Sequence, residues 1–243
     1  MLDIIILTLF PQHMGDFFLK GIFKRAHENK LFTFRAIDLR DFTQDKYRSV
    51  DDYPVGHRQG MVLKADIIER AILSIEHWAD YQLLYTCPKG PVITQESING
   101  FLKASFRGLI VLCGYYEGVD ERIFSVFPFQ RFSIGEFVLS SGDLPALVLT
   151  EALIRQIPGV LGNTSSLKDD SIISGLLEYP QYTSPQTWHE ISVPEILYSG
   201  HHKNIETWQK KQAFALTLKE KPHLLIDYPL DANDKKQLTD LLR

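Results

Sequence analysis

The sequence is poor in cysteine and has no apolar stretch of the roughly 18 residues needed to cross a bilayer. Cys87 and Cys113 each end an apolar run, a position that favours buried, reduced thiols over a disulfide or a metal site. The start of the chain, Met1-Leu2-Asp3, lacks the basic segment of a signal peptide. We therefore expect a cytoplasmic protein that makes no contact with a membrane.

The sequence also lacks an excess of positive charge and the common nucleotide-binding fingerprints. Its formal net charge of −4 gives no overall attraction to nucleic acid, so a local patch would have to bind such a partner. Neither G-x-G-x-x-G nor a P-loop is present, so a nucleotide-like ligand would be bound by another geometry. His189, His201 and His202 have no cysteine beside them and adjacent histidines point apart, so we expect no metal site.

Strand-like and helix-like patterns alternate along the first part of the chain. Residues 3–10 form a continuous apolar run rich in isoleucine, typical of a strand that is covered on both faces. Apolar residues at helical spacing follow in residues 17–26, and residues 32–39 suggest a second strand. Further strands are predicted at residues 82–86 and 109–113, and helices at residues 61–78 and 95–106. This alternation predicts an α/β fold with a parallel sheet.

Residues 109–146 contain the clearest candidate for a ligand site. Two apolar runs, residues 109–113 and 132–139, are read as buried strands, and each ends in a loop that contains glycine. A helix with Pro145 near its first position follows and continues through residues 147–157. Because parallel α/β sheets bind ligands at the carboxyl ends of their strands, we expect a ligand there.

The last third of the chain differs in kind. Residues 162–171 have no apolar period and read as a flexible linker. Helices are predicted at residues 204–218 and 231–242, with no obvious strand. We therefore divide the chain into a main α/β domain at residues 1–161, a linker at residues 162–171 and a smaller, mainly helical domain at residues 172–243.

Eight short motifs carry a resemblance to one known family. They are LTLFP at 7–11, VDD at 50–52, GYYEGVDER at 114–122, SIGEFVLS at 133–140, IPGVLG at 157–162, LEYPQYT at 177–183, VPE at 193–195 and SGHH at 199–202. In this order they resemble the TrmD family of bacterial tRNA (guanine-N1)-methyltransferases, in the SPOUT superfamily. The resemblance covers essentially the whole chain.

The resemblance implies a SPOUT-type α/β fold in which the parallel sheet contains a deep trefoil knot, a rare exception to the rule against knots. It implies a homodimer with active sites between the subunits, a C-terminal domain that binds tRNA, and a linker that closes as a lid when tRNA binds. The methyl donor would be S-adenosylmethionine, and magnesium is allowed as an assisting ion. The matching donor-binding positions are Tyr85, Thr86, Gly114, Tyr116, Glu117, Gly118, Ile134, Gly135, Phe137, Leu139, Gly142 and Pro145.

The resemblance also implies a catalytic pair. N1 of guanine carries a proton, so its methylation needs a base to remove that proton and a positive group to hold charge that moves toward O6. By motif position the base is Asp170 and the positive group is Arg155, and a shift of one residue would exchange Asp170 for Asp169.

Several positions depart from the family's pattern. A glycine-rich run is replaced by PVGHRQGM at residues 54–61, so His57 and Arg58 stand where the family has glycine. Tyr115 and Ser184 stand at usual arginine positions, and Ser141 stands where a second glycine is usual. Gln209 also follows Trp208 in place of arginine.

These features support one main hypothesis and leave two others open. The main hypothesis is a methyltransferase acting on N1 of the guanine 3′ of the anticodon, at position 37 of tRNA. The second is a divergent SPOUT enzyme with another RNA target, suggested by the altered loop at residues 54–61. The third is a catalytically impaired RNA-binding remnant.

Overall fold

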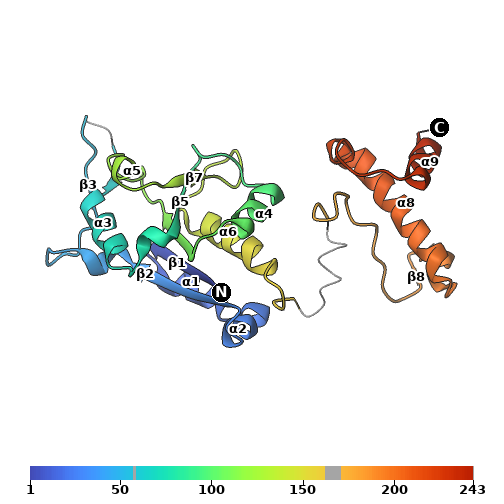
Figure 1. The fold of residues 1–243 in the computed structure, drawn as a ribbon, viewed down its shortest axis with the longest axis horizontal. Helices are drawn as coiled ribbons and strands as arrows, with labels where there is room; N and C mark the ends of the chain where they lie inside the picture. The colour runs from blue at the N-terminus through green and yellow to red at the C-terminus, as the bar shows by residue number, and fades with distance from the viewer. Residues whose placement is uncertain (57–58, 162–170, 243) are drawn as a thin grey trace. The chain divides into compact units, whose positions relative to one another are not determined.

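The computed structural model describes residues 1–56, 59–161 and 171–242. Contacts within the chain divide it into two compact units, residues 1–162 and residues 163–243 (Figure 1). The predicted base Asp170 and its alternative Asp169 lie outside the described residues, as do His57 and Arg58 of the altered loop.

A parallel sheet of five strands forms the centre of the first unit (Figure 1). The strands are β1 (Leu2–Thr8), β2 (Phe32–Asp38), β5 (Tyr81–Thr86), β6 (Gly108–Cys113) and β7 (Gln130–Phe132). Their order is β2-β1-β6-β5-β7, and every neighbouring pair is parallel. The predicted α/β class with a parallel sheet is therefore confirmed.

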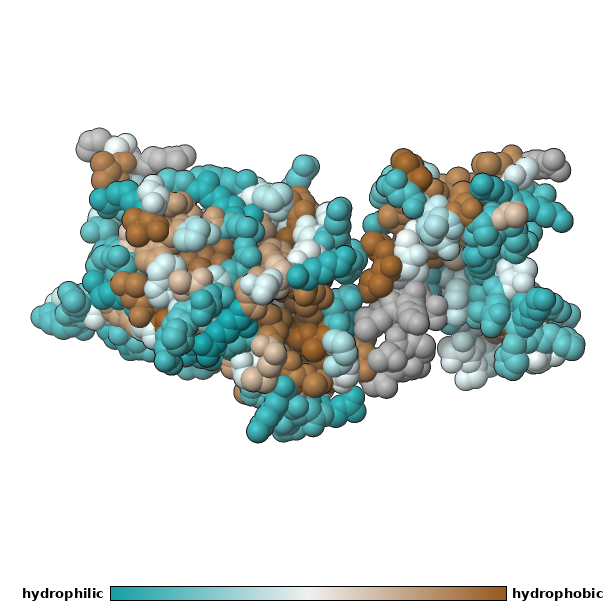
Figure 2. Space-filling model, in the orientation of Figure 1, coloured by the Kyte–Doolittle hydropathy of each residue, from teal (hydrophilic) through white to brown (hydrophobic). Residues whose placement is uncertain are grey.

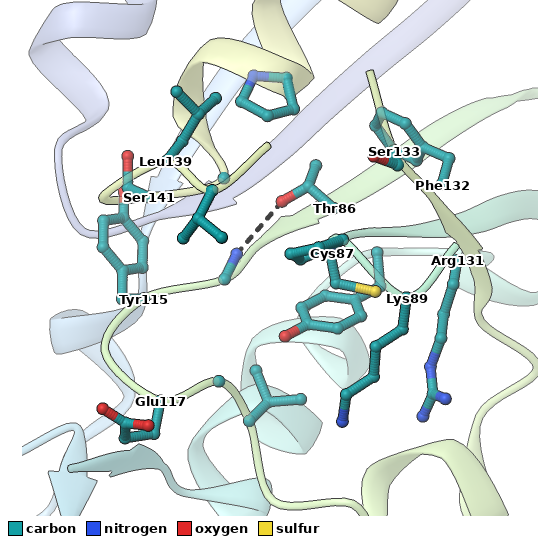
Figure 3. Close-up of a pocket in the computed structure, with 18 of the residues that line it drawn as sticks. Thr86, Cys87, Lys89, Tyr115, Glu117, Arg131, Phe132, Ser133, Leu139 and Ser141 are labelled. Carbon is teal, nitrogen blue, oxygen red and sulfur yellow. Dashed lines mark hydrogen bonds between the residues drawn. The ribbon is translucent and has the colours of Figure 1, made fainter. Parts of the chain in front are cut away.

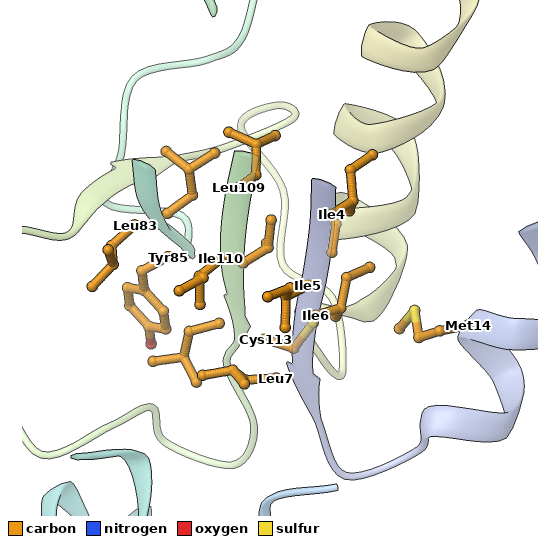
Figure 4. Packing of buried hydrophobic residues seen from close by; sticks show 14 of the residues in the cluster. Ile4, Ile5, Ile6, Leu7, Met14, Leu83, Tyr85, Leu109, Ile110 and Cys113 are labelled. Carbon is orange, nitrogen blue, oxygen red and sulfur yellow. The ribbon is translucent and has the colours of Figure 1, made fainter. Parts of the chain in front are cut away.

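Strand β1 is covered on both faces, as its unbroken apolar run predicts. Ile4, Ile5, Ile6 and Leu7 are fully buried. Figure 4 shows Ile4 and Ile6 on the side of helix α6 (Asp143–Arg155), and Ile5 and Leu7 on the other side. Helix α6 packs against β1, β5 and β6, so it covers the middle of the sheet.

Other helices of the first unit are shorter than their patterns suggest. The region predicted as one helix at residues 17–26 forms α1 (Pro11–Phe18) and α2 (Gly21–Glu28). Gly21, the first residue of α2, has a positive φ of 56°, which breaks the path of a continuous helix. Helix α3 (Ala65–Leu73) begins later than predicted. Before it, residues of β4 (Val62–Leu63) pair with β3 (Asp51–Asp52) in an antiparallel hairpin.

The remaining elements of this unit are short connections around the sheet. Helix α4 (Gln95–Lys103) starts at a capping box formed by Thr94 and Ser97, which satisfies free amides at its first turn. The others are η1 (Leu39–Phe42), η2 (Trp78–Asp80) and α5 (Ile123–Val126).

The prediction of a strand at residues 132–139 is wrong beyond the first of these residues. Strand β7 ends at Phe132, and a turn follows in which Ser133 Oγ donates to the Gly135 carbonyl oxygen at 2.8 Å. Phe137 and Val138 are exposed rather than buried in the sheet. An apolar run alone does not distinguish a strand from a loop whose apolar side chains face a cavity.

The second unit is mainly helical, with α8 (His202–Glu220) and α9 (Ala232–Leu241) packed around buried Phe214. Short turns η3 (Glu195–Tyr198) and η4 (Pro222–Leu225) flank α8. The expectation of no strand is wrong here, because β8 (Thr187–Trp188) and β9 (Ile191–Ser192) form a small antiparallel hairpin. Strands of two residues are too short to give a periodic signal.

The two cysteines are free, as predicted. Cys113 is fully buried at the end of β6, and burial raises the pKa of its thiol well above the usual value. Cys87 is only half-buried, because it stands just after β5 at the rim of a pocket.

Candidate active site

A pocket of about 280 Å³ lies where the carboxyl ends of β5, β6 and β7 meet. Its walls are the loops that follow these three strands and the start of α6 (Figure 3). The ends of parallel strands converge on one edge of a sheet, so loops that are far apart in the sequence come together there. The position agrees with the ligand site expected within residues 109–146.

The structure brings together most of the residues predicted to bind the methyl donor. Those that line the pocket are Tyr85, Thr86, Gly114, Tyr116, Glu117, Gly118, Ile134, Phe137, Leu139, Gly142 and Pro145. Gly135 is not among the lining residues, because it stands in the turn held by Ser133.

Two glycines allow the loops of the pocket to approach each other closely. The Gly142 amide donates to the Gly114 carbonyl oxygen at 2.7 Å. A Cβ atom at Gly142 would lie 1.7 Å from Thr86 Oγ1 and 2.6 Å from the Gly114 nitrogen. No side chain fits at this position, so glycine is required for the loops to meet.

The loop at residues 114–118 holds a strained conformation. Tyr116 has a φ of 55°, which is costly for a residue with a side chain, and the residue is 54% exposed. The Glu117 amide donates to the Met61 carbonyl oxygen at 3.0 Å, and Gly60 packs directly against the Glu117 side chain. The end of the altered loop at residues 54–61 is therefore in contact with the pocket wall.

Charged side chains of both signs border the pocket. Figure 3 shows Lys89 and Arg131 side by side, with Glu117 across the cavity. The Arg131 guanidinium pairs with the Glu121 carboxylate and lies 4.2 Å from the centre of the Phe124 ring. A ligand with both an anionic and a cationic group fits this lining.

Sequence reasoning identified the loops but not every charged side chain within them. Lys89 belongs to the glycine-bearing turn after β5, and Arg131 lies in β7 just before the family motif at residues 133–140. A charged residue inside or beside an apolar strand end is a signal that could have indicated both. Their convergence depends on the β5–β7 pairing, which puts Arg131 beside Tyr85.

Burial changes the acidity of the tyrosine at the end of β5. Tyr85 is 6% exposed, and burial raises the pKa of its hydroxyl to about 12, with a further increase from the nearby Cys87. This phenol is therefore neutral at physiological pH and acts as a hydrogen-bonding group rather than as a base.

The predicted catalytic arginine does not line this pocket. Arg155 is half-buried in the last turn of α6, whereas Pro145 of the first turn borders the cavity. At 1.5 Å per residue, roughly 15 Å of helix separates the two residues. Within the first unit, Arg155 therefore stands at the far end of α6 from the pocket.

Neither a metal cluster nor a membrane span is found in the part of the chain that the structure describes. No three His, Cys, Asp or Glu side chains among those residues are grouped as a metal would require. None of the described helices is both long enough and apolar enough to pass through a bilayer.

The fold and the pocket define an α/β protein with a cavity at the carboxyl ends of its parallel strands, the position at which such sheets bind small molecules. Comparison with known proteins identifies its family. A sequence model described as tRNA (Guanine-1)-methyltransferase TrmD matches residues 2–227. The tRNA (guanine-N(1)-)-methyltransferase of Syntrophomonas wolfei is 43% identical over 237 residues, which cover 98% of this chain and 96% of that protein.

Two further relatives carry the same name. The protein of Desulforamulus reducens is 42% identical over 239 residues, covering 97% of this chain and 93% of its own. That of Staphylococcus epidermidis is 41% identical over 232 residues, covering 96% and 94%. The chain therefore belongs to the tRNA (guanine-N1)-methyltransferase family TrmD and is a methyltransferase, which confirms the predicted resemblance.

Proposed function

We propose that this protein transfers a methyl group from S-adenosylmethionine to N1 of the guanine at position 37 of tRNA, 3′ of the anticodon. The observation that carries this proposal is the family match, which extends over nearly the whole chain rather than over the pocket alone. Since tRNA is its substrate, we infer that the protein acts in the cytoplasm.

The pocket at the ends of β5, β6 and β7 fits the methyl donor. Gly114 and Gly142 let two loops meet in the pocket wall, and Phe137 and Leu139 add apolar surface against which a planar base can pack. The charged rim formed by Lys89 and Glu117 suits a zwitterionic amino-acid end. When bound, S-adenosylmethionine supplies an activated methyl group.

The protein's own residues would supply the proton chemistry. Asp170 would accept the proton from N1 of guanine, and Arg155 would stabilise the negative charge that develops at O6. In this proposal magnesium assists the transfer.

Helix α6 supports the proposal of a homodimer with active sites between subunits. Its sequence, DLPALVLTEALIR, is apolar on almost every side, which is typical of a helix that is covered all round. Yet Leu144 is 58% exposed and Val148 is 46% exposed, and Figure 2 shows apolar surface over this helix. Arg155 falls on the same side of the helix as these two residues.

A second copy that covers this face would explain the position of Arg155. Because the arginine stands at the far end of α6 from its own pocket, it would act on the guanine beside the donor that the partner chain holds. The C-terminal domain would bind tRNA, and residues 162–171 would act as the lid. We further propose that the loops joined through Gly114 and Gly142 belong to a trefoil knot.

A methyl-transfer assay on unmodified tRNA transcripts tests the function. We expect transfer to a transcript with guanine at position 37 and none when adenine replaces it. Transfer to neither transcript would contradict the proposal and favour a remnant. Transfer to another nucleotide would favour a divergent target.

The catalytic assignment has its own test, in which Asp170→Ala is compared with Asp169→Ala. Loss of a general base typically lowers kcat by about 10²- to 10⁴-fold. We expect this loss for Asp170→Ala, with the dissociation constant for S-adenosylmethionine within about twofold of the wild-type value because the aspartate acts on the guanine. Strong residual turnover in Asp170→Ala, together with loss in Asp169→Ala, would move the role of base to Asp169.

A further inference from the structure

A buried hydrogen-bond cluster stands behind the pocket, between residues that the family resemblance did not assign to donor binding. The Tyr115 hydroxyl donates to Asp143 Oδ1 at 2.5 Å and accepts from the Leu9 amide at 3.2 Å. Thr8 Oγ1 lies 2.7 Å from the same hydroxyl and donates to Asp143 Oδ1 at 2.9 Å. Ser141 Oγ donates to Asp143 Oδ2 at 3.3 Å.

This cluster joins three segments that are far apart in the sequence. Thr8 ends β1, Tyr115 lies in the loop after β6, and Asp143 is the first residue of α6. Figure 3 shows the Tyr115 ring pointing away from Glu117 and toward the segment that carries Ser141. The backbones of Tyr115 and Ser141 form an isolated antiparallel bridge beside this contact.

The cluster lies next to the contact between Gly114 and Gly142, where two loops of the pocket meet. Tyr115 is directly preceded by Gly114, and Asp143 is directly preceded by Gly142, the two glycines whose backbones meet at 2.7 Å. Tyr115 and Ser141 themselves line the cavity. A carboxylate at the first turn of a helix is favoured by the helix dipole, so Asp143 is a stable acceptor for the phenol.

Replacement of Tyr115 would remove hydrogen bonds that other groups in the cluster need. It is 6% exposed, so a phenylalanine would leave the Leu9 amide and the Asp143 carboxylate short of a buried partner. The loop lies beyond the end of the β6 ladder, and backbone bonds to Met61 and Leu63 hold its far part at Glu117 and Gly118. The Tyr115 cluster adds side-chain hydrogen bonds at its start.

We propose that Tyr115 is a positioning residue for the methyl donor: its hydroxyl, bonded to Asp143, holds the loop at residues 114–118 against residues 141–143 in the shape that binds the donor. This inference rests on the proposed function. Tyr115 acts through the loops it joins and not on the reacting atoms.

A second buried tyrosine in the same sheet provides a matched control. Tyr81 is also 6% exposed, and its hydroxyl donates to Asp3 Oδ2 at 2.5 Å, the same distance as in the Tyr115–Asp143 pair. A threonine completes this pair too, since Thr33 Oγ1 donates to Asp3 Oδ1. Tyr81 stands at the start of β5, at the opposite edge of the sheet from the pocket.

The test compares Tyr115→Phe with Tyr81→Phe in the full-length protein, by calorimetric binding of S-adenosylmethionine and by thermal unfolding. Both variants lose a buried bond to a carboxylate, so we expect similar decreases in Tm. Only Tyr115→Phe should raise the dissociation constant for S-adenosylmethionine, by about tenfold. Its KM for the donor should rise in parallel, with kcat at saturating donor and KM for tRNA within about twofold.

Asp143→Asn keeps the measurement decisive if Tyr115→Phe does not fold. We expect it to weaken donor binding in the same direction, and the double variant to bind no more weakly than the worse single variant, because both changes remove one interaction. Donor affinity that is unchanged in Tyr115→Phe, or lowered equally in Tyr81→Phe, would overturn the inference. A wild-type protein that binds no donor would instead overturn the proposed function and, with it, this inference.

Discussion

A hydrogen-bonded tyrosine–aspartate pair occurs at each end of the parallel strands, in two different settings. We call the end where the strands begin the amino edge and the end where they finish the carboxyl edge. At the amino edge, Tyr81 is bonded to Asp3, and both residues belong to strands that are held by ladder hydrogen bonds. At the carboxyl edge, Tyr115 is bonded to Asp143, and both residues lie beyond the ends of the strands. The amino-edge pair reinforces strands that the ladder already holds, whereas the carboxyl-edge pair joins two loops that lie outside the ladder and line the pocket.

The glycines at the two edges repeat this contrast. A Cβ atom at Gly108 would lie 1.9 Å from the Asp3 carbonyl oxygen, so it would push β6 away from β1. A Cβ atom at Gly142 would lie 1.7 Å from Thr86 Oγ1, so it would push the pocket loops apart. Equal crowding therefore has different consequences, because one glycine lies in the sheet and the other in the site.

The largest effect is expected from a comparison of Gly142→Ala with Gly108→Ala. Crowding in a packed region costs about 1–3 kcal/mol. For Gly142→Ala we expect this cost in donor binding, as a dissociation constant raised up to about 100-fold. For Gly108→Ala we expect the same cost as a lower free energy of unfolding, with the donor affinity of the folded protein nearly unchanged. Calorimetry and urea unfolding separate the two, and equal loss of donor binding in both variants would erase the contrast.

A helical glycine serves as the control for this pair. A Cβ atom at Gly100 in α4 meets nothing within 4 Å, so Gly100→Ala should leave donor binding unchanged. Since alanine favours a helix over glycine, its unfolding free energy should rise by about 0.5–1 kcal/mol.

The next effect concerns alkaline pH. Burial raises the pKa of Tyr85 to about 12, from 10.0 in the unfolded chain. Between these values the unfolded chain loses this proton while the folded protein keeps it, so the stabilisation is complete below pH 10 and is lost as the pH rises toward 12. We expect this group to account for about 2 kcal/mol of that loss.

Urea unfolding at pH 9 to 12 measures this contribution. Tyr85→Phe should flatten the alkaline decrease in stability. Burial and the hydrogen bond to Asp3 also raise the pKa of Tyr81, and Arg107 and Arg35 oppose the increase. The rise is smaller than that of Tyr85, so Tyr81→Phe should flatten the decrease less. A larger change for Tyr81→Phe would show that the tyrosine at the amino edge, and not Tyr85, contributes more to the alkaline loss of stability.

The smallest effect is expected on α6, which begins at the carboxyl edge and carries Arg155 to its far end. If a second copy covers Val148, a charge there should weaken the dimer, and Val148→Lys should raise its dissociation constant about tenfold through lost apolar burial. Analytical ultracentrifugation measures this change. Methyl transfer should fall with the dimer at low protein concentration, whereas Glu69→Lys, on α3, should leave both unchanged. A Val148→Lys dimer as tight as the wild type would show that this face is not the interface.

Much of the fold follows from local patterns in the sequence. The apolar run at residues 3–10 predicted a strand covered on both faces, and Ile4 to Leu7 are fully buried. The pattern failed at residues 133–139, where apolar side chains border a cavity. Periodicity reports that a side chain avoids water, but it does not report whether a strand or a ligand pocket provides the cover.

The candidate site shows the same division. Family motifs indicated the loops that line the pocket, since each motif is contiguous in the sequence. They did not indicate that Arg131 would pair with Glu121, or that Lys89 would lie beside it. Such contacts depend on β7 pairing with β5, and no local pattern specifies which strands become neighbours.

The sequence by itself determined the fold class, the family and the loops from which the pocket is built, because strand burial and motif order are properties of contiguous residues. Only the tertiary structure decided that Tyr115 meets Asp143, 28 residues further along the chain, and that Thr8 joins them. The strand order β2-β1-β6-β5-β7 creates the edge at which these residues converge. A hydrogen bond across that edge requires three separate segments to be in place at once, and that condition is met only in the folded protein.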